Sequence, residues 1–369
     1  MRILQILHDD ERGGVQTIAA MIEEGLLPRH VVFETVYLYP RHGYPTLLKL
    51  FAVARMAWRI WRGDFDALIA YQSTASILVG MVGWLRGCRL RIVHQTCPPL
   101  EMPRLLRWID RIIGVLGFYS VNVANSAATW CEFAHYPAWY RRSMIIIEHG
   151  LDAPAPSHMR EEARRRFNLP ASQPILLNVG RLTEQKNQDV LIRALACLPD
   201  AHLALAGGGP KDKPFRSLAA TLGLSSRLHM LGAVPAADIA DLYIAADLFV
   251  FPSTWETFGL AAVEAAMVGM PIVAADLAVL REVLHVDGAE PVDYVAPDDV
   301  EGWIGAIRSA LATPPSPRVV ATFARAMRRK YSREGMIESY IALVEGQARH
   351  GQKERRRTDL QTAAKQVQP

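Results

Sequence analysis

Two glutamates lie close to the start of a predicted helix, Glu256 just before it and Glu264 within it. The apolar run 247–251 predicts a buried strand, and the Ala- and Leu-rich run 259–268 predicts a helix. Glu256 therefore belongs to the loop between them, and Glu264 to the helix. The first N–H groups of that helix, near 258–260, have no helical partner and attract anions such as a diphosphate. A carboxylate on the helix can accept hydrogen bonds from a ribose diol.

Two basic residues follow another predicted strand, 175–179. Arg181 offers a planar fork and Lys186 a point charge, and both suit phosphate oxygens. The alternative for an isolated Arg and Lys is two solvated surface charges. Glu256 could also be present only because acidic residues are favoured near the start of a helix, where they interact with the helix dipole. That alternative does not explain Glu264, which stands among apolar residues, where an acid is costly without a partner.

In this order the motifs resemble the retaining glycosyltransferases of the GT-B fold, in family 4. The resemblance rests on Pro-Ser-x-x-Glu-x-Phe-Gly-Leu-x-x-x-Glu-Ala at 252–265, Gly-Arg-Leu with Lys-Asn at 180–187, and a glycine turn at 206–210. It is strongest over 174–297 and weaker in the first half of the chain. It implies an α/β fold of two Rossmann-like domains, with parallel sheets facing a cleft and a C-terminal helix that crosses back to the first domain.

The resemblance also implies roles for individual residues. Arg181 and Lys186 would hold the diphosphate, Glu264 the ribose hydroxyls, and Glu256 would lie beside the donor sugar. Catalytic roles are expected for Arg181, Lys186, Glu256 and His94. Further donor contacts are expected from Gly14, Thr257, Phe258, Gly259 and Leu260.

Two of these expectations have a structural alternative. His94 ends the predicted strand 91–94, where open sheets bind ligands, but Gln95 and Thr96 replace the acid that usually follows it in the family. A buried structural histidine is the alternative. Gly14 follows the first strand and lets a backbone approach a phosphate or sugar, or it serves only a tight turn.

The chain of 369 residues suggests two domains. Strand-like and helix-like runs alternate throughout, which predicts a parallel sheet with crossover helices in each half. We expect an acceptor-binding domain at 1–152 together with a returning helix at 333–348. A donor-binding domain is expected at 153–332, and a basic, disordered tail at 349–369.

Composition narrows the function. Half the residues are hydrophobic, and the formal net charge of +4 comes without a base-reading motif, so no nucleic acid partner is expected. The scattered cysteines fit a reducing compartment. No signal peptide or membrane-spanning segment is predicted, so the expected location is cytoplasmic, with peripheral attachment at the inner face of a membrane left open. The cysteines are Cys88, Cys97, Cys131 and Cys197.

Two further patterns each have two interpretations. Asp64-Phe65-Asp66 has the Asp-x-Asp form of a metal site, but it introduces a predicted strand, so no metal and no other cofactor is expected. Residues 104–116 are basic and amphipathic, which fits either an anionic membrane surface or a helix that covers its own sheet. For the similar stretch 47–61 the covering helix is favoured.

The function expected is that of a retaining, metal-independent glycosyltransferase. It would move a sugar from a nucleoside diphosphate sugar to a hydroxyl of a glycan or lipid-linked acceptor, in surface polysaccharide synthesis. Two alternatives remain: a sugar-nucleotide epimerase on the same fold, and a binding protein without catalysis. Release of free nucleoside diphosphate only when an acceptor is present would distinguish a glycosyltransferase from an epimerase and from a binding protein.

Overall fold

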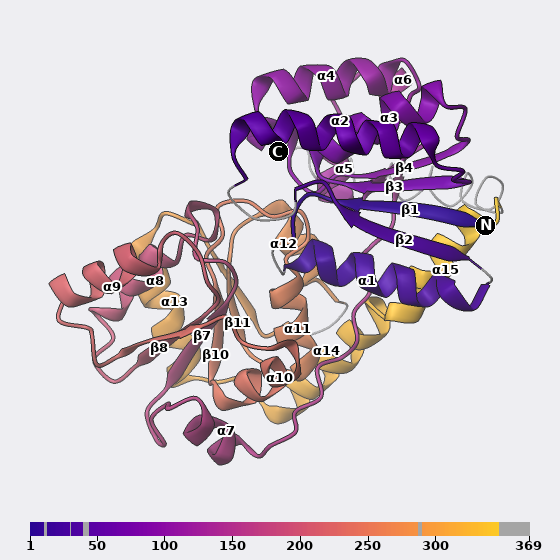
Figure 1. The fold of residues 1–369 in the computed structure, drawn as a ribbon. Coiled ribbons are helices and arrows are strands. Elements are labelled where there is room, and N and C mark those ends of the chain that lie inside the picture. The colour runs from indigo at the N-terminus through magenta and orange to yellow at the C-terminus, as the bar shows by residue number, and fades with distance from the viewer. Residues whose placement is uncertain (11–12, 30, 40–43, 287–289, 347–369) are drawn as a thin grey trace. The chain divides into compact units, whose positions relative to one another are not determined.

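The computed structural model describes residues 1–10, 13–29, 31–39, 44–286 and 290–346. Its contacts divide the chain into two compact units. Unit 1 comprises Met1–Gly150 and the chain from Arg333 onward, and unit 2 is Leu151–Ser332 (Figure 1). The basic tail expected at 349–369 lies outside the described residues.

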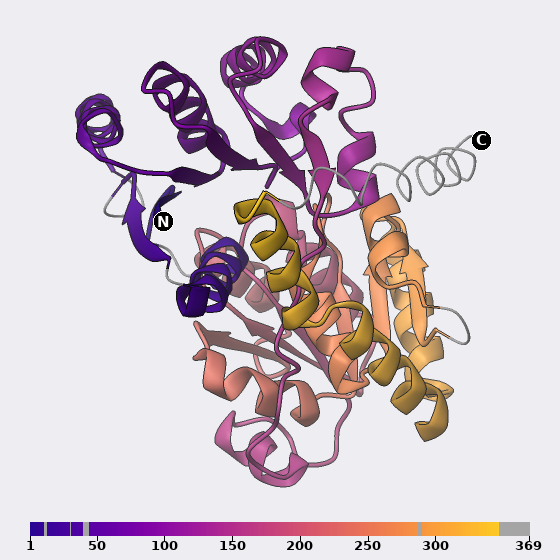
Figure 2. The same cartoon turned by 90° about the vertical axis from the view of Figure 1, so that its right-hand side faces the viewer.

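Within its described part, unit 1 holds a six-stranded sheet in the order β2-β1-β3-β4-β5-β6, and every pair is parallel. Helices α2, α3, α4 and α6 form one layer over it, and α1 packs beside α15 (Figures 1 and 2). The strands are β1 (Arg2–Leu7), β2 (Val32–Tyr37), β3 (Ala67–Tyr71), β4 (Leu90–His94), β5 (Val121–Ala124) and β6 (Met144–Ile146). The helices are α1 (Gly14–Leu26), α2 (Thr46–Arg62), α3 (Ser73–Leu85), α4 (Arg104–Val115), α5 (Ala127–Cys131), α6 (Ala138–Arg141) and α15 (Arg333–Val344).

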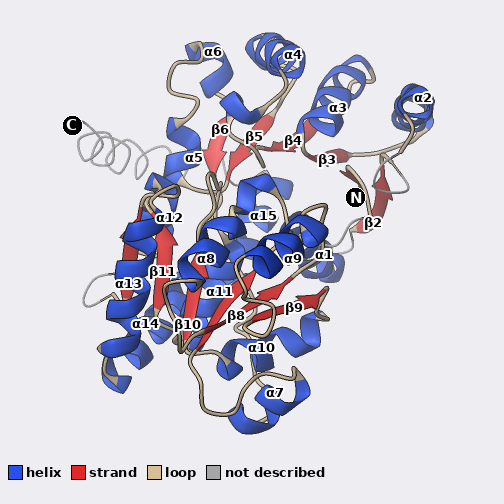
Figure 3. Ribbon diagram, turned by 90° about the vertical axis from the view of Figure 1, so that its left-hand side faces the viewer, coloured by secondary structure: helices blue, strands red, loops and turns tan. Residues whose placement is uncertain are grey.

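The described part of unit 2 repeats this plan with the order β12-β11-β10-β7-β8-β9, again all parallel. Helices α8 and α13 pack on one face of the sheet, and α11 and α14 on the other (Figure 3). The strands are β7 (Ile175–Val179), β8 (His202–Ala206), β9 (Leu228–Gly232), β10 (Leu248–Phe251), β11 (Ile272–Ala275) and β12 (Val292–Val295). The helices are α7 (Arg160–Arg166), α8 (Gln188–Leu195), α9 (Asp212–Thr221), α10 (Ala236–Ala245), α11 (Leu260–Val268), α12 (Ala278–Val283), α13 (Val300–Ala312) and α14 (Pro317–Lys330).

The two parallel α/β sheets expected from the alternating pattern are therefore confirmed. The predicted helix after Arg333 is α15, which belongs to unit 1, where Arg333 Nη2 lies 2.5 Å from Glu24 Oε2 on α1. One strand was missed, the edge strand β12. Asp293 breaks its short apolar pattern, and an edge strand buries less side-chain surface than a central one, so the sequence carries a weak signal there.

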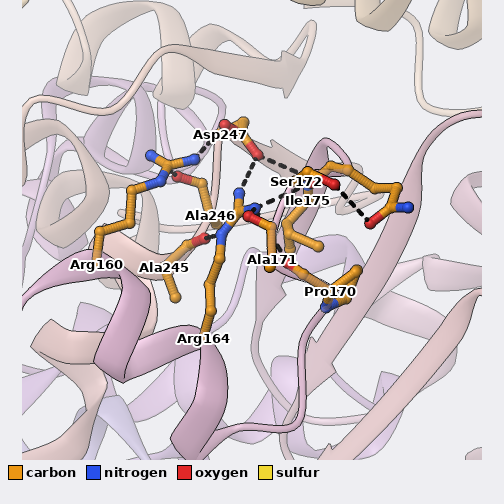
Figure 4. A network of polar contacts seen from close by, with 10 residues as sticks. Arg160, Arg164, Pro170, Ala171, Ser172, Ile175, Ala245, Ala246 and Asp247 are labelled. Atoms are coloured by element: carbon orange, nitrogen blue, oxygen red, sulfur yellow. Dashed lines mark hydrogen bonds and ion pairs between the residues drawn. The ribbon is translucent and has the colours of Figure 1, made fainter.

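A buried arginine fixes the amino ends of β7 and β10 (Figure 4). Arg164 on α7 is 4% exposed, and its guanidinium donates to Asp247 Oδ2 at 2.7 Å. The same carboxylate oxygen accepts the N–H of Ile175 at 2.7 Å, and Arg160 pairs with the other oxygen. Further donors of Arg164 bond the carbonyl oxygens of Ala245, Pro170 and Ala171. The network sets the two strands side by side, so the loops at their opposite ends meet.

Candidate functional site

The carboxyl ends of β7 and β10 bring two predicted site residues together. Lys186 follows β7 and Glu256 follows β10, and Lys186 Nζ forms an ion pair with Glu256 Oε1. Their side chains are 16% and 9% exposed, so the pair is largely withdrawn from water. The ammonium group also lies 5.0 Å from the centre of the Phe251 ring, a cation–π contact. The structure thus joins the two motifs that the sequence separates by 70 residues.

Hydrogen bonds lock the loops that carry this ion pair. Asn187 adopts the left-handed conformation, with φ of 51°, which asparagine tolerates better than most residues. Its side-chain amide donates to the carbonyl oxygens of Pro252 at 3.2 Å and Pro297 at 2.7 Å. The N–H of Thr254 donates to the carbonyl oxygen of Gln185 at 2.8 Å. Lys186 and Glu256 therefore sit on two loops fixed to each other.

The glycine turn after β8 fixes the backbone around Arg181. Gly207 has φ of +147°, and a Cβ there would stand 1.9 Å from the carbonyl oxygen of Gly180. A Cβ on Gly209, with φ of +153°, would stand 2.4 Å from the carbonyl oxygen of Leu182. Only glycine allows this approach. It holds the backbone of Arg181, whose side chain is exposed.

Helix α11 begins directly after the loop that carries Glu256. Its N-cap, Gly259, has φ of +88°, and a Cβ there would meet Leu280 Cδ2 at 2.8 Å. The preceding Phe258 is 2% exposed and packs edge-on against Tyr331, with ring centres 5.1 Å apart. The first N–H groups of α11, from Leu260 on, have no helical carbonyl to pair with, and the positive end of the helix dipole lies there. This end of the helix can bind an anion.

Glu264, on the next turn of α11, has a partner that the sequence analysis missed. Tyr243 on α10 is fully buried, and its hydroxyl donates to Glu264 Oε2 at 2.8 Å and also lies 3.1 Å from the carbonyl oxygen of Ala261. Burial raises the pKa of Glu264, and the Tyr243 hydrogen bond counteracts part of that rise. An acid in an apolar setting needs a donor, so the residues around Glu264 already indicated a partner without showing which residue supplies it.

His94 lies inside unit 1 with both ring nitrogens engaged. Nδ1 is 3.0 Å from the carbonyl oxygen of Ala70, Nε2 is 2.7 Å from the Tyr340 hydroxyl, and the ring stacks on Tyr71 at 4.3 Å. The residue is 4% exposed, and burial lowers its pKa to about 4. These contacts favour the structural alternative for His94. Contact with a donor sugar stays a prediction.

The pKa of His94 leads to a pH prediction. Because the folded pKa lies below the ordinary 6.5, the unfolded chain binds the extra proton first, and stability falls as pH drops from about 6.5 to 4. One such group contributes a slope of about 1.4 kcal/mol per pH unit, an upper value, within that window. We expect His94→Gln to lose that part of the slope in urea unfolding at several pH values. His135→Gln, which alters an exposed histidine, should keep it.

Other groups also titrate in this region and stay in place for the comparison, including His202 and His229, whose pKa values burial lowers. Burial lowers the pKa of His149 to about 3, which adds to the acid sensitivity. Burial raises the pKa of Asp110 to about 6, which acts in the opposite direction. All of them are present in every variant. His94 also lowers the pKa of His149, so the difference for His94→Gln includes this coupling, while the other contributions cancel. An unchanged slope in His94→Gln would contradict the assignment of a neutral, buried imidazole.

Thr257, a predicted donor contact, is partly exposed in the loop before α11 of unit 2, and the other remaining predicted positions lie in unit 1. Gly14 is the first residue of α1, at the carboxyl end of β1. Asp66 Oδ2 accepts the N–H of Arg2 at 2.7 Å, so this carboxylate, with Asp64 nearby in the chain, lies at the amino ends of β1 and β3. Open parallel sheets bind ligands at the opposite edge. Among the described residues there is no group of three or more His, Cys, Asp or Glu placed to hold a metal ion, and no helix long and apolar enough to cross a membrane.

Two parallel α/β units, one with a helix start beside a largely buried Lys–Glu pair, are the arrangement expected of a GT-B glycosyltransferase. A family model described as "Glycosyl transferases group 1" matches residues 159–327. The D-inositol 3-phosphate glycosyltransferase of Nocardia farcinica is 30% identical over 351 residues, which cover 87% of this chain and 76% of that protein. That of Kineococcus radiotolerans is 31% identical over 312 residues, 73% of this chain and 71% of that protein. The chain belongs to the group 1 glycosyltransferases.

Solved structures share the fold at lower identity. HepE of Anabaena, determined in complex with UDP and glucose, superposes with a TM-score of 0.79 at 20% identity. The match covers 94% of this chain and all of that one. Sucrose-phosphate synthase of Thermosynechococcus elongatus gives a TM-score of 0.78 at 20% identity, over 94% and 98% of the two chains. These likenesses establish the GT-B fold expected from the sequence.

Proposed function

We propose that this glycosyltransferase moves a sugar from a nucleoside diphosphate sugar to an acceptor hydroxyl, with retention of configuration and without a metal ion. The observation that carries the proposal is the Lys186–Glu256 ion pair beside the amino end of α11. Hydrogen bonds of Asn187 and Thr254 fix the two loops that carry the pair. The UDP in the HepE structure, which shares the fold, supports a nucleotide donor.

Each residue of the site has a distinct task in this proposal. The N–H groups at 259–261 and the positive end of α11 bind the diphosphate, together with Arg181 and Lys186. The Glu264 carboxylate accepts hydrogen bonds from the ribose hydroxyls while Tyr243 holds its second oxygen. Since Lys186 already has Glu256 as a partner, a diphosphate competes with that carboxylate for the ammonium group.

The reaction breaks the bond between the anomeric carbon and the diphosphate oxygen and forms a bond from that carbon to the acceptor oxygen on the same face. The acceptor proton passes to the leaving phosphate. Negative charge grows on the diphosphate as its bond to carbon breaks. Arg181, Lys186 and the end of α11 stabilise that charge, so the protein acts mainly by electrostatics.

For the acceptor, the proposal from sequence is a glycan or lipid-linked molecule in surface polysaccharide synthesis. Relatives that are named D-inositol 3-phosphate glycosyltransferases, at about 30% identity, favour a second candidate, a phosphorylated polyol. We also propose that the protein is located in the cytoplasm and attaches peripherally to the inner face of a membrane.

Release of free nucleoside diphosphate, measured over a panel of donors, tests the proposal. Each donor is offered with no acceptor, with D-inositol 3-phosphate, and with lipid-linked or glycan acceptors. If the protein transfers sugar, the release of nucleoside diphosphate should increase when one class of acceptor is added. Conversion of the donor sugar without release would instead indicate an epimerase. Affinity for nucleotides without turnover on any acceptor would indicate a binding protein.

Metal dependence gives a separate prediction. Because basic side chains and a helix end supply the positive charge, we expect activity in excess chelator to stay within about twofold of the untreated rate. The assay is the same nucleotide release, after dialysis against EDTA. A complete loss that manganese or magnesium restores would bring back Asp64 and Asp66 as candidate ligands and overturn the metal-independent mechanism.

A further inference from the structure

The outer side of the helix layer α2, α3, α4 and α6 in unit 1 exposes large aromatic side chains. Five of the eight tryptophans in the chain lie there: Trp58 (58% exposed), Trp61 (49%), Trp84 (47%), Trp108 (62%) and Trp139 (64%). These helices pack side by side, α2 against α3, α3 against α4 and α4 against α6 (Figure 1). Monomeric soluble proteins rarely expose apolar patches of this extent without a binding role.

Helix α4 has a buried side of its own, so the apolar residues on its exposed side are not core residues turned toward solvent. Leu105, Trp108 and Ile112 form a stripe on its outer side and are 67%, 62% and 36% exposed. Its inner side carries Asp110, which is 1% exposed and accepts hydrogen bonds from the hydroxyls of Tyr119 and Tyr140, both at 2.7 Å.

Close packing fixes the inner side of α4 as well. Ile113 is 4% exposed, and a Cβ on Gly114 would stand 2.2 Å from the Tyr140 ring. The helix therefore cannot rotate its outer stripe inward. One side of α4 therefore packs inside unit 1, as the covering-helix interpretation of 104–116 expects, and a second apolar side faces solvent. Contact of that side with a membrane stays a prediction.

The exposed charges on these four helices have one sign. Asp110 is the one acidic residue in the four helices, and its carboxylate is buried. Basic residues flank the tryptophans. Arg62 lies 4.4 Å from the Trp58 ring, and Arg142, just after α6, lies 4.7 Å from the Trp139 ring. On α4, Arg104 and Arg111 are exposed beside the apolar stripe.

We infer that this layer, α2–α3–α4–α6, docks unit 1 on a bilayer surface that contains anionic lipids. Tryptophan prefers the boundary between headgroups and acyl chains, and arginine binds lipid phosphates. A second copy of the chain fits less well, because a two-fold interface would place arginine against arginine. The inference does not depend on the sugar-transfer reaction, since lipid binding is measured without donor or acceptor.

Flotation of the full chain with vesicles tests the inference. Vesicles of phosphatidylcholine alone are compared with vesicles in which about one third of the lipid is phosphatidylglycerol. We expect binding to the anionic vesicles only, weakened by high salt. The variant Arg104→Glu with Arg111→Glu should bind at least about tenfold less. The matched control is Arg318→Glu with Arg325→Glu, exposed at the same spacing on α14 of unit 2, and should bind as the wild type does.

A second variant tests the apolar contribution. Trp108→Ser keeps every charge, and we expect weaker binding together with less quenching of tryptophan fluorescence by lipids brominated on their acyl chains. Circular dichroism melts confirm folding of each variant. Equal binding by the α4 and α14 charge variants would overturn the inference. So would a concentration-dependent dimer, in sedimentation without lipid, that the α4 variants abolish.

Discussion

Replacing Lys186 by alanine should lower kcat by about a hundredfold or more at saturating donor, with a smaller loss of nucleotide affinity. Charge grows on the diphosphate as the sugar bond breaks, so the Lys186 ammonium group contributes more in the transition state than in the bound ground state. Steady-state kinetics of nucleotide release measure kcat, and titration calorimetry measures nucleotide affinity. Arg181→Lys should also be impaired, because a point charge cannot replace the guanidinium fork.

The ion pair determines the controls for this prediction. Lys186→Ala leaves the Glu256 carboxylate, 9% exposed, without its cation, which can destabilise the fold. The double variant Lys186→Ala with Glu256→Gln removes that stranded charge and should restore folding but not kcat. Lys213→Ala, at an exposed lysine on α9 of the same unit, should leave both folding and kcat unchanged. A near-normal kcat in a folded Lys186→Ala variant would rule out the electrostatic mechanism even though the fold is that of a GT-B enzyme.

The second large effect is expected at Glu264. If its carboxylate holds the ribose hydroxyls, Glu264→Ala should weaken nucleoside diphosphate binding by about 1.5–3 kcal/mol, the size of a charged hydrogen bond. That corresponds to about a tenfold to 150-fold rise in Kd. Titration calorimetry with the nucleoside diphosphate measures it without any acceptor. Unchanged affinity in a folded variant would remove Glu264 from the site.

Tyr243 provides a sharper test of the same arrangement. Tyr243→Phe removes the hydroxyl that holds Glu264 Oε2 and keeps the ring, so we expect a smaller loss, about threefold to tenfold in affinity. In the Glu264→Ala background the same change should have little further effect, because its target is gone. Independent effects of the two substitutions would show that Tyr243 does not act through Glu264.

Local sequence patterns accounted for most of the strands and for the start of helix α11. The apolar run between Pro174 and Gly180 gave β7 with the bounds that the structure shows, and the strand predicted at 247–251 matches β10 to within one residue. Such runs are recognisable because central strands of a parallel sheet are buried on both faces. The edge strand β12 lacks that continuous apolar signal. Helix α11 was recognisable from its Ala-rich run and from Gly259, which the left-handed turn at its start requires.

What the sequence by itself determined is the kinds of groups available: a basic pair after one strand, an acid at a helix start, and an acid within an apolar helix. The tertiary structure decided which of them meet. Lys186 pairs with Glu256 because β7 and β10 are neighbours in the sheet, although not in sequence. Tyr243 reaches Glu264 because α10 packs against α11.

The same holds for the surroundings of His94 and of α4. The identity of His94 does not reveal that Tyr340, 246 residues later, occupies its Nε2. The pattern of α4 does not reveal which of its two apolar sides faces the sheet, and the buried contacts of Asp110 decide it. Periodicity reports local geometry, whereas partners and orientation depend on contacts between distant parts of the chain, which form only when the sheets assemble.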